Sequence, residues 1–258
     1  MIIAATGMQK PSGTIHDLVD LRRDPIVTEV RNMIAGCEGC VVAASGGMDS
    51  LALMMAAVLA LKGAEQVKIV HVDHGLRPNA WRDSMMCRIQ ATSIGCEFVE
   101  KKIWIPRDGN IYESARHARY AAIASCAGGC RVLTAHHADD LAETIIMRLA
   151  RGSPMQSSIF IGSEVKIFGC TVQRPLLSFS KKELGDFVRR SGMPWVDDES
   201  NFNLKRERAR LRAGVMKSLE EMYPGFSVAA AKSILSRPEA DSHRDQAPRS
   251  PLSHRKSG

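Results

Sequence analysis

Residues 39 to 53 read Gly-Cys-Val-Val-Ala-Ala-Ser-Gly-Gly-Met-Asp-Ser-Leu-Ala-Leu, and they give the strongest indication of the fold. Residues 41–44 are apolar and partly β-branched, and an apolar pattern of helical length follows from Leu51 to Leu61. We therefore expect a strand, a tight loop and a helix N-terminus. Two adjacent glycines, Gly46 and Gly47, let the backbone turn and approach a ligand closely. A loop of this kind at a helix N-terminus binds phosphate.

The same loop carries hydroxyl groups and one acid. Ser45 and Ser50 add donors beside the N–H groups that the first helical turn leaves unpaired. No lysine follows the glycines, so an ordinary nucleotide triphosphatase loop, Gly-x-x-x-x-Gly-Lys-Ser/Thr, is disfavoured. Asp49 at the helix entry would repel phosphate unless a metal ion joined the two. A glycine turn that merely starts a helix is the alternative interpretation.

The rest of the chain alternates predicted strands and helices. We expect strands at residues 67–72, 96–104 and 131–135, and helices at residues 25–33, 79–94, 112–126 and 139–151. Strands separated by single helices predict an α/β fold with a doubly wound parallel sheet, which binds ligands at the carboxyl ends of its strands. Further helices are expected at residues 181–190 and 228–235, the latter in a small helical C-terminal extension. The predicted units are a partly disordered N-terminal extension (1–36), a main domain (37–222) and a short helix with a disordered basic tail (223–258).

Composition bounds the class of protein. The chain of 258 residues is 45% hydrophobic, which is enough for a sizeable core. It contains neither an apolar run long enough to span a membrane nor a signal-peptide pattern, so we expect a cytoplasmic protein without a membrane partner. The net charge of +7 is concentrated in residues 205–217, which hold six basic residues against Glu207. Such a cluster indicates a nucleic-acid partner or, alternatively, a solvated helix face.

Seven cysteines in a chain without a secretion signal argue for reduced thiols. The spacings of Cys37 with Cys40 and of Cys126 with Cys130 would also allow a four-thiolate metal site. Each pair, however, precedes a predicted strand, at the end of the sheet opposite the phosphate loop. We therefore expect buried free thiols.

Two further polar clusters, residues 71–77 and 136–143, fall at the loop's edge of the predicted sheet. Residues 136–144 read His-His-Ala-Asp-Asp-Leu-Ala-Glu-Thr, which places two histidines and three acids at a strand-to-helix junction. Asp49, Asp139 and Asp140 are candidate magnesium ligands, although an acid at a helix start is also favourable as a cap. Arg116 and Arg119 lie one helical turn apart, so both can face one phosphate group, or they form an ordinary surface pair.

Together these motifs resemble one family, the tRNA(Ile)-lysidine synthases, which are ATP pyrophosphatases of the PP-loop type. The resemblance covers residues 38 to about 222 and rests on motifs at 45–50, 71–77, 114–120, 136–144, 174–177, 195–201 and 208–212. It implies a PP-loop catalytic domain, a ligase that forms a C–N bond, and ATP and Mg²⁺ as cofactors. The reaction it implies adenylates the C2 oxygen of the wobble cytidine in the isoleucine tRNA with anticodon CAU. L-lysine then displaces AMP. We also expect that the chain can form a homodimer.

The resemblance also implies roles for residues. Ser45, Gly46, Gly47 and Ser50 would hold the leaving pyrophosphate. Asp49 and Asp139 would position magnesium or the lysine ammonium, and Arg116 would neutralise the α-phosphate. His137 would relay protons, and one of Asp139, Asp140 and Glu143 would select the lysine amine. The nucleotide-binding set also includes Met48, Asp73 and His74, and the tRNA-binding set is Arg119, Arg151, Arg208, Arg210 and Arg212.

The chain departs from the family pattern in two places. Leu141 stands where the family usually has glutamine, and residues 154–158 replace a run of glycines and leucines in a loop expected near the anticodon. Two other functions therefore remain open. One is a tRNA thiolation enzyme with the same loop, which needs cysteines near the ATP. The other is a nucleotide- or tRNA-binding module that has lost turnover.

Overall fold

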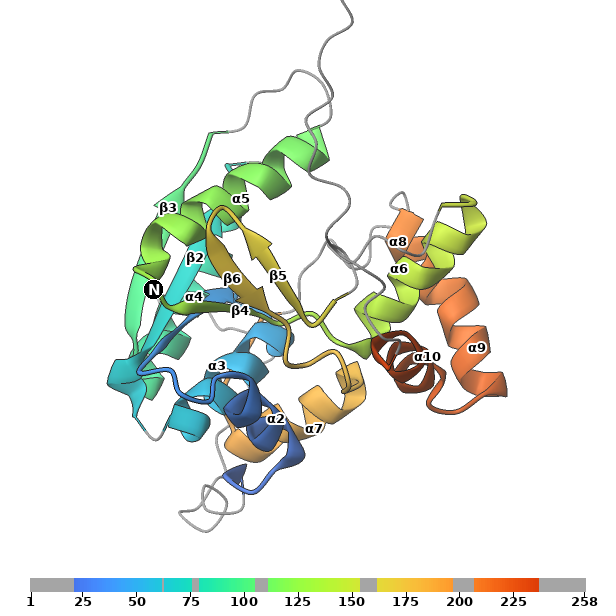
Figure 1. The fold of residues 1–258 in the computed structure, drawn as a ribbon, viewed down its shortest axis with the longest axis horizontal. Coiled ribbons are helices and arrows are strands. Elements are labelled where there is room, and N and C mark those ends of the chain that lie inside the picture. The colour runs from blue at the N-terminus through green and yellow to red at the C-terminus, as the bar shows by residue number, and fades with distance from the viewer. Residues whose placement is uncertain are drawn as a thin grey trace, which may run out of the picture.

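A computed structural model of the chain describes residues 21–61, 63–75, 79–104, 111–153, 162–196 and 207–236. Within these ranges one sheet has the strand order β3-β2-β1-β4-β6-β5 (Figure 1). All neighbouring strands are parallel except β5, which forms an antiparallel pair with β6. The strands are β1 (Cys40–Ala44), β2 (Val67–Asp73), β3 (Glu97–Lys102), β4 (Arg131–Thr134), β5 (Glu164–Ile167) and β6 (Cys170–Gln173).

Helices cover both faces of the sheet, as a doubly wound fold requires (Figure 1). On one face lie α2 (Pro25–Met33), α3 (Met48–Leu61), α4 (Ala80–Ile94) and α7 (Lys181–Ser191). On the other face α5 (Ile111–Ala127) packs on β1, β2, β4 and β6 through Tyr120 and Ile123. Because each central strand contributes side chains to both faces, β1 reads as an almost unbroken apolar run.

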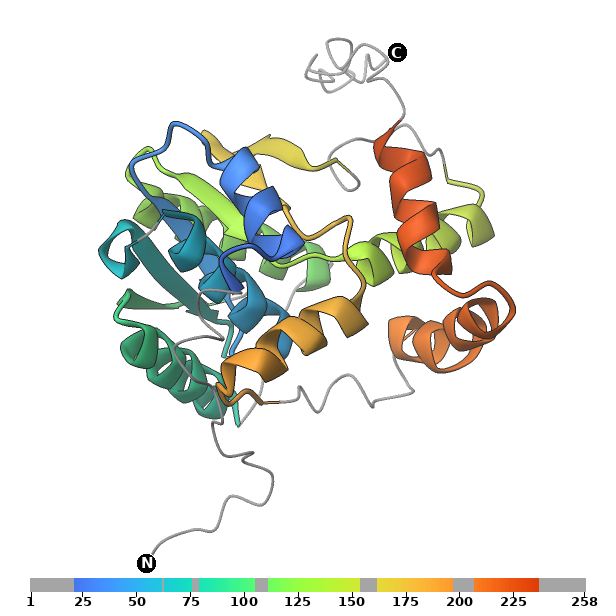
Figure 2. The ribbon, with the colours of Figure 1, turned by 90° about the horizontal axis from the view of Figure 1, so that it is seen from below.

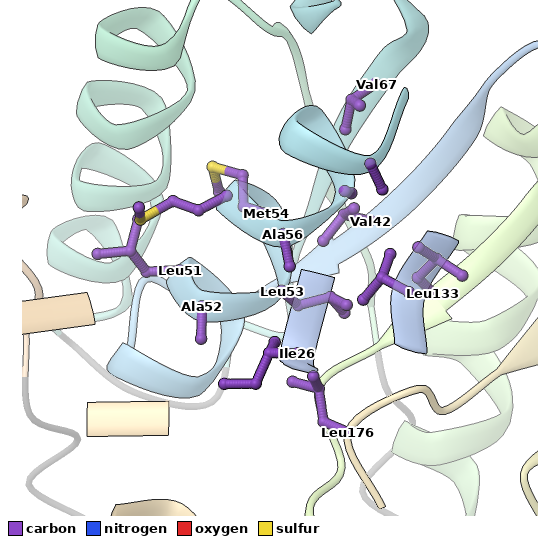
Figure 3. Close-up of a cluster of buried hydrophobic side chains, with 14 of the residues drawn as sticks. Ile26, Val42, Leu51, Ala52, Leu53, Met54, Ala56, Val67, Leu133 and Leu176 are labelled. Atoms are coloured by element: carbon purple, nitrogen blue, oxygen red, sulfur yellow. The ribbon is translucent and has the colours of Figure 1, made fainter. Parts of the chain in front are cut away.

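The larger core lies between α3 and the sheet. Leu51, Leu53 and Met54 of α3 are fully buried, and Val42 and Leu133 meet them from β1 and β4 (Figure 3). Ile26 of α2 closes the same cluster (Figure 3). The helix that begins at the loop is therefore fixed along its length, which holds the loop in place.

The C-terminal helices gather at one side of the sheet (Figure 1). Figure 2 shows α10 (Phe226–Leu235) lying across α6 (Ala138–Ala150), and Ala138, Leu141 and Ala231 share a small core there. Residues 207–222 form a nearly continuous helix made of α8 (Glu207–Leu211), a π-helical turn (Arg212–Met216) and α9 (Lys217–Met222). A π-helical turn is uncommon and frequently accompanies a functional site.

The predicted fold class is confirmed: an α/β fold with a mostly parallel doubly wound sheet and a helical C-terminal region. The helix at 25–33 has the predicted bounds, and α7 is capped by Ser180 and Glu183 at its start and by left-handed Gly192 at its end. The β5–β6 pair was not predicted. The division into units at residues 36 and 222 stays a prediction, although Leu21, Ile26 and Val27 lie in the larger core. None of the described helices is long and apolar enough to cross a membrane.

Candidate functional site

The diglycine bend, residues 45–50, is shaped by a backbone conformation that requires glycine. Gly46 has a φ of 82°, a region that other residues rarely adopt. A Cβ atom on Gly46 would lie 2.9 Å from the carbonyl oxygen of Asp83 and 3.3 Å from the Cβ atom of Met86. Gly46 therefore allows both the left-handed turn and the close approach of α4.

The carbonyl oxygen of Gly46 is anchored from two sides. It accepts a hydrogen bond from Gln90 Nε2 at 3.2 Å and one from the backbone N–H of Val196 at 3.3 Å. Gln90 is fully buried and also donates to the carbonyl oxygen of Pro194 at 3.0 Å. This residue was not predicted from the sequence. The signal was a glutamine on the buried face of α4, between Cys87 and Ala91.

Ser50 contributes to the shape of the bend. Its side chain is buried, and its hydroxyl group donates to the carbonyl oxygen of Gly47 at 2.9 Å. The Ser50 hydroxyl oxygen also lies 3.3 Å from the backbone nitrogen of Ser45 and 3.3 Å from the Ser45 hydroxyl oxygen. The first intrahelical bond runs from the N–H of Leu51 to Gly47. The N–H groups before it have no partner within the helix and can therefore bind an anion.

Substituting Gly46 with alanine is expected to destabilise the fold and weaken nucleotide binding, because both the φ angle and the contact with Asp83 oppose a side chain. The matched control is Gly36→Ala, since Gly36 has a similar φ of 77° and nothing lies within 4 Å of the point where its Cβ atom would be placed. We expect the control to cost about 1 kcal/mol and Gly46→Ala about 2–3 kcal/mol in the free energy of unfolding. Urea titrations measure both values, and equal losses would contradict the role of the close approach.

Three carboxylates surround His137, which is the N-cap residue of α6. Its Nε2 atom lies 3.6 Å from Asp49 Oδ2 and 3.5 Å from Asp140 Oδ2, and its Nδ1 atom lies 3.3 Å from Asp139 Oδ2. Burial lowers the pKa of His137, but Asp140, Asp139 and Asp49 outweigh it and raise the pKa to about 10. His137 is therefore a buried cation that joins the first turns of α3 and α6.

The helix start agrees with the capping interpretation for Asp140, which completes a capping box. His137 is the N-cap residue, and the carboxylate of Asp140, at N3, accepts from the His137 backbone N–H at 3.3 Å. Asp139 accepts from the backbone N–H of Lys181, the first residue of α7, at 2.8 Å. Burial opposes ionisation of both carboxyl groups, yet His137 and these N–H donors lower their pKa values. Both acids are therefore ionised.

The free energy of unfolding is expected to depend on pH through His137. Its pKa is about 10 in the fold and 6.5 ordinarily, so its stabilisation is complete below pH 6.5 and is lost as the pH rises towards 10. Between about pH 7 and pH 9 we expect a loss of about 2 kcal/mol in the wild type and a much smaller loss in His137→Gln. The comparison stops near pH 9 because the buried thiols of Cys40 and Cys87, with pKa values raised to about 12, add a similar loss above it. Urea titrations across this range would contradict the assignment if the two proteins showed the same slope.

The residues at this end of the sheet fit a magnesium ion that also binds phosphate. Asp49 Oδ1 is buried, and nothing in the described part of the chain makes a hydrogen bond to it. Within the same residues no group of three or more His, Cys, Asp or Glu side chains has the arrangement of a metal site. Magnesium usually needs only one or two carboxylates when phosphate oxygens complete its coordination. Asp49 is the residue whose geometry suits that role, and Asp139, the second predicted ligand, contacts His137 and Lys181.

Glu143, the remaining acid of the cluster, is fully buried and bound by an arginine. Arg212 donates from Nε to Glu143 Oε1 at 2.7 Å and from a terminal nitrogen to Oε2 at 3.2 Å. Arg208, one turn earlier, donates to the Thr144 hydroxyl group at 2.8 Å. The first residue of the π-helical turn is thus held against α6. Among the acids predicted to select an amine, Asp139 and Asp140 have partly exposed side chains, at 29% and 22%, whereas Glu143 is fully buried.

The other predicted residues lie around the same edge. Asp73 ends β2, which pairs with β1, and His74 follows it; Asp73 Oδ1 accepts from the Gly75 N–H at 2.9 Å. Met48 is the first residue of α3, and its Sδ atom lies 3.2 Å from the point where a Cβ atom on Gly185 of α7 would be placed. Among the predicted tRNA-binding arginines, Arg210 is exposed, Arg151 contacts Glu207, and Arg119 lies with Arg116 on α5.

The two departures from the family pattern have different outcomes. Leu141 is buried and packs with Leu177 and Ala231, so it belongs to the contact between α6 and α10. Residues 154–160 lie outside the described residues.

A doubly wound sheet with a diglycine bend at the end of its first strand defines a class of phosphate-binding α/β proteins. The chain belongs to the PP-loop domain family, which matches residues 24–219. It is 32% identical over 205 residues to a tRNA(Ile)-lysidine synthase of Haemophilus influenzae, covering 77% of this chain and 48% of that protein. It is 35% identical over 198 residues to one of Burkholderia mallei, covering 74% of this chain and 40% of that protein. The chain thus spans less than half the length of these relatives.

The fold is also similar to a solved structure with a different printed activity. The U34-tRNA thiolase NcsA from Methanococcus maripaludis, solved with its 4Fe–4S cluster, superposes with a TM-score of 0.66 and 14% sequence identity. The match covers 85% of this chain and 78% of that chain. At this level of identity the likeness concerns the fold alone.

Proposed function

We propose that the chain ligates L-lysine to C2 of the wobble cytidine in the isoleucine tRNA with anticodon CAU, using ATP. One observation supports this most: the first turns of α3 and α6 meet, with His137 Nε2 3.6 Å from Asp49 Oδ2 beside the diglycine bend. A phosphate-binding bend and a group of carboxylates at one sheet edge are the parts that nucleotidyl transfer followed by attack of an amine requires. The relatives named tRNA(Ile)-lysidine synthase support the choice of substrates.

The first step of the proposed reaction is adenylation. The C2 oxygen of the cytidine attacks the α-phosphorus of ATP, and the bond to pyrophosphate breaks. The N–H groups of Gly46 and Gly47 would hold the pyrophosphate as its negative charge grows, and Arg116 would neutralise the α-phosphate. Asp49 would hold Mg²⁺, which supplies charge neutralisation on the phosphates when bound.

The second step is displacement by lysine. The ε-ammonium group passes a proton to the carboxylate of Asp139 or Asp140, the amine attacks C2, the C2–O bond breaks, and AMP leaves. Asp139 and Asp140 are ionised and partly exposed, so they suit an ammonium group better than Glu143, which Arg212 already binds through both oxygens. The surrounding carboxylates raise the pKa of His137 to about 10, which favours its protonated form, so its proposed part is to hold these carboxylates in place. A cytoplasmic location and a homodimer remain predictions.

The thiolation alternative needs cysteines near the nucleotide, and the positions of the thiols oppose it. Cys37, Cys40, Cys96 and Cys130 precede or begin strands, so they lie at the amino edge of the sheet, opposite the bend. Cys87 lies nearer the site, but burial raises its pKa to about 12, so its thiol is unreactive. Labile iron in the purified protein, or lost activity in Cys37→Ser, would favour thiolation instead.

The test measures pyrophosphate release from ATP with Mg²⁺, a CAU-anticodon tRNA transcript and labelled L-lysine, and then omits each in turn. We expect release to require the tRNA, and the label to enter the RNA only when all components are present. Intact tRNA binding without pyrophosphate under any condition would contradict the proposal and favour a binding module.

A further inference from the structure

A second group of polar side chains lies on the α5 face of the sheet. Tyr120 of α5 is 3% exposed, and the guanidinium carbons of Arg116 and Arg119 lie 5.2 and 5.4 Å from its ring centroid. Arg174 directly follows β6 at its carboxyl end and is also 3% exposed. Three guanidinium groups thus gather around one buried phenol at the edge of the sheet that carries the bend.

The three positive charges act on the same two side chains. Burial raises the pKa of Tyr120, but Arg119, Arg116 and Arg174 outweigh it and lower the pKa. His136, which follows β4, has its pKa lowered to about 3 by burial and by the same arginines, although Asp140 opposes the shift. Neutral His136 lies 3.0 Å from the Thr134 hydroxyl oxygen through Nδ1. Guanidinium groups gathered in this way repel one another, and an anion between them would relieve the repulsion.

Two polar atoms of the group lack hydrogen bonds. The phenol oxygen of Tyr120 and Nε of Arg119 are both buried without a hydrogen-bond partner among the residues that the structure describes. Hydrogen bonding with Tyr120 contributes to the shifted pKa values of Tyr120 and Arg174, so both Arg119 and Arg174 lie close to the phenol oxygen. Neither contact, however, has the distance and angle of a complete hydrogen bond to that oxygen. Both atoms carry a proton that a phosphate oxygen can accept, and the arginine fork suits a tetrahedral anion.

We propose that Arg116, Arg119, Arg174 and Tyr120 form one phosphate-binding pocket, in which Arg174 and Tyr120 are binding residues. The inference rests on the proposed function, because one of its substrates supplies the phosphate. That phosphate is either the α-phosphate of ATP or a phosphodiester of the RNA beside the modified cytidine. Arg174 follows β6 and the diglycine bend follows β1, and only β4 lies between these two strands. The pocket therefore lies near the proposed nucleotide site, where both the nucleotide and the RNA must come together.

The sharpest test is Tyr120→Phe, because it removes the unpaired oxygen and keeps the ring beneath Arg116 and Arg119. A purely structural tyrosine would lose nothing in phosphate affinity. We expect unchanged or higher stability and about a tenfold loss of affinity for one of two probes. The probes are α,β-methylene-ATP without RNA and a CAU anticodon stem-loop without nucleotide.

Arg174→Gln is the companion variant, with Arg88→Gln as its matched control. Arg88 is 61% exposed and faces Glu100 on β3, at the opposite edge of the sheet. We expect Arg174→Gln to lose affinity for the same probe as Tyr120→Phe, and Arg88→Gln to change neither. If the RNA is the source, the slope of log affinity against log salt concentration should fall by about one. If the nucleotide is the source, RNA binding stays unchanged.

Folded Tyr120→Phe and Arg174→Gln proteins that bind both probes like the wild type would overturn the pocket. If Arg174→Gln does not fold, Arg119→Gln replaces it, with the same expected and contradicting results. These measurements need no turnover, so they separate the two proposals. If the variants lose affinity but the wild type never incorporates lysine, the phosphate-binding pocket is supported and the ligase function is contradicted.

Discussion

Replacing Asp49 with asparagine is expected to reduce tRNA-dependent pyrophosphate release on the order of 10³-fold while the fold is retained. Asp49 Oδ2 lies 3.6 Å from His137 Nε2, and its buried Oδ1 atom has no hydrogen-bond partner in the described residues. The amide keeps the size of the side chain but loses the negative charge that would hold Mg²⁺ against the phosphates. Initial rates of pyrophosphate release measure the effect, and circular dichroism checks the fold.

The control for this variant is Asp186→Asn, which removes a carboxylate that is 57% exposed and contacts Arg189 on α7. We expect its rate to match that of the wild type. Turnover of Asp49→Asn at the rate of the control would refute the role of Asp49.

The largest effect on stability is expected for Glu143→Ala. Glu143 is fully buried, and both of its carboxylate oxygens accept hydrogen bonds from Arg212, whose side chain is 34% exposed. Removing one partner leaves a partly buried charge and a cavity, so we expect a loss of about 3–5 kcal/mol in the free energy of unfolding by urea titration. The control, Glu221→Ala, breaks an exposed pair with Lys217 and should cost less than about 1 kcal/mol.

A double variant separates the charge from the packing. Glu143→Leu combined with Arg212→Leu removes both charges together, so it should recover a large share of the stability lost in Glu143→Ala. A double variant as unstable as the single one would show that packing, rather than the unpaired charge, causes the loss.

Much of the fold could be predicted because local signals agreed with the tertiary structure. The apolar run of β1, the diglycine bend and the long apolar helix α3 follow one another without ambiguity in residues 40–61. The β5–β6 pair was missed because its strands have only four residues each, the shortest run over which alternation indicates a strand. Such short segments at a sheet edge carry little periodic signal.

The site could be predicted only in part, because its contacts join residues distant in sequence. Motifs indicated which acids and arginines to examine, but Asp49 and His137 meet only when α3 and α6 begin at neighbouring strand ends. The pairing of Arg212 with Glu143, 69 residues apart, likewise follows from packing of the π-helical turn on α6. Gln90 and Arg174 carried weaker signals. Gln90 is a polar residue on the buried face of α4. Arg174 begins the motif at residues 174–177, to which the sequence assigned no chemistry.

We expect the diglycine bend to hold the leaving phosphates beside the acids of α3 and α6. A crystal structure with α,β-methylene-ATP and Mg²⁺ tests this arrangement. It should show the β- and γ-phosphates within hydrogen-bond distance of the Gly46 and Gly47 N–H groups, with Mg²⁺ against Asp49. Nucleotide bound elsewhere, with the bend empty, would contradict it.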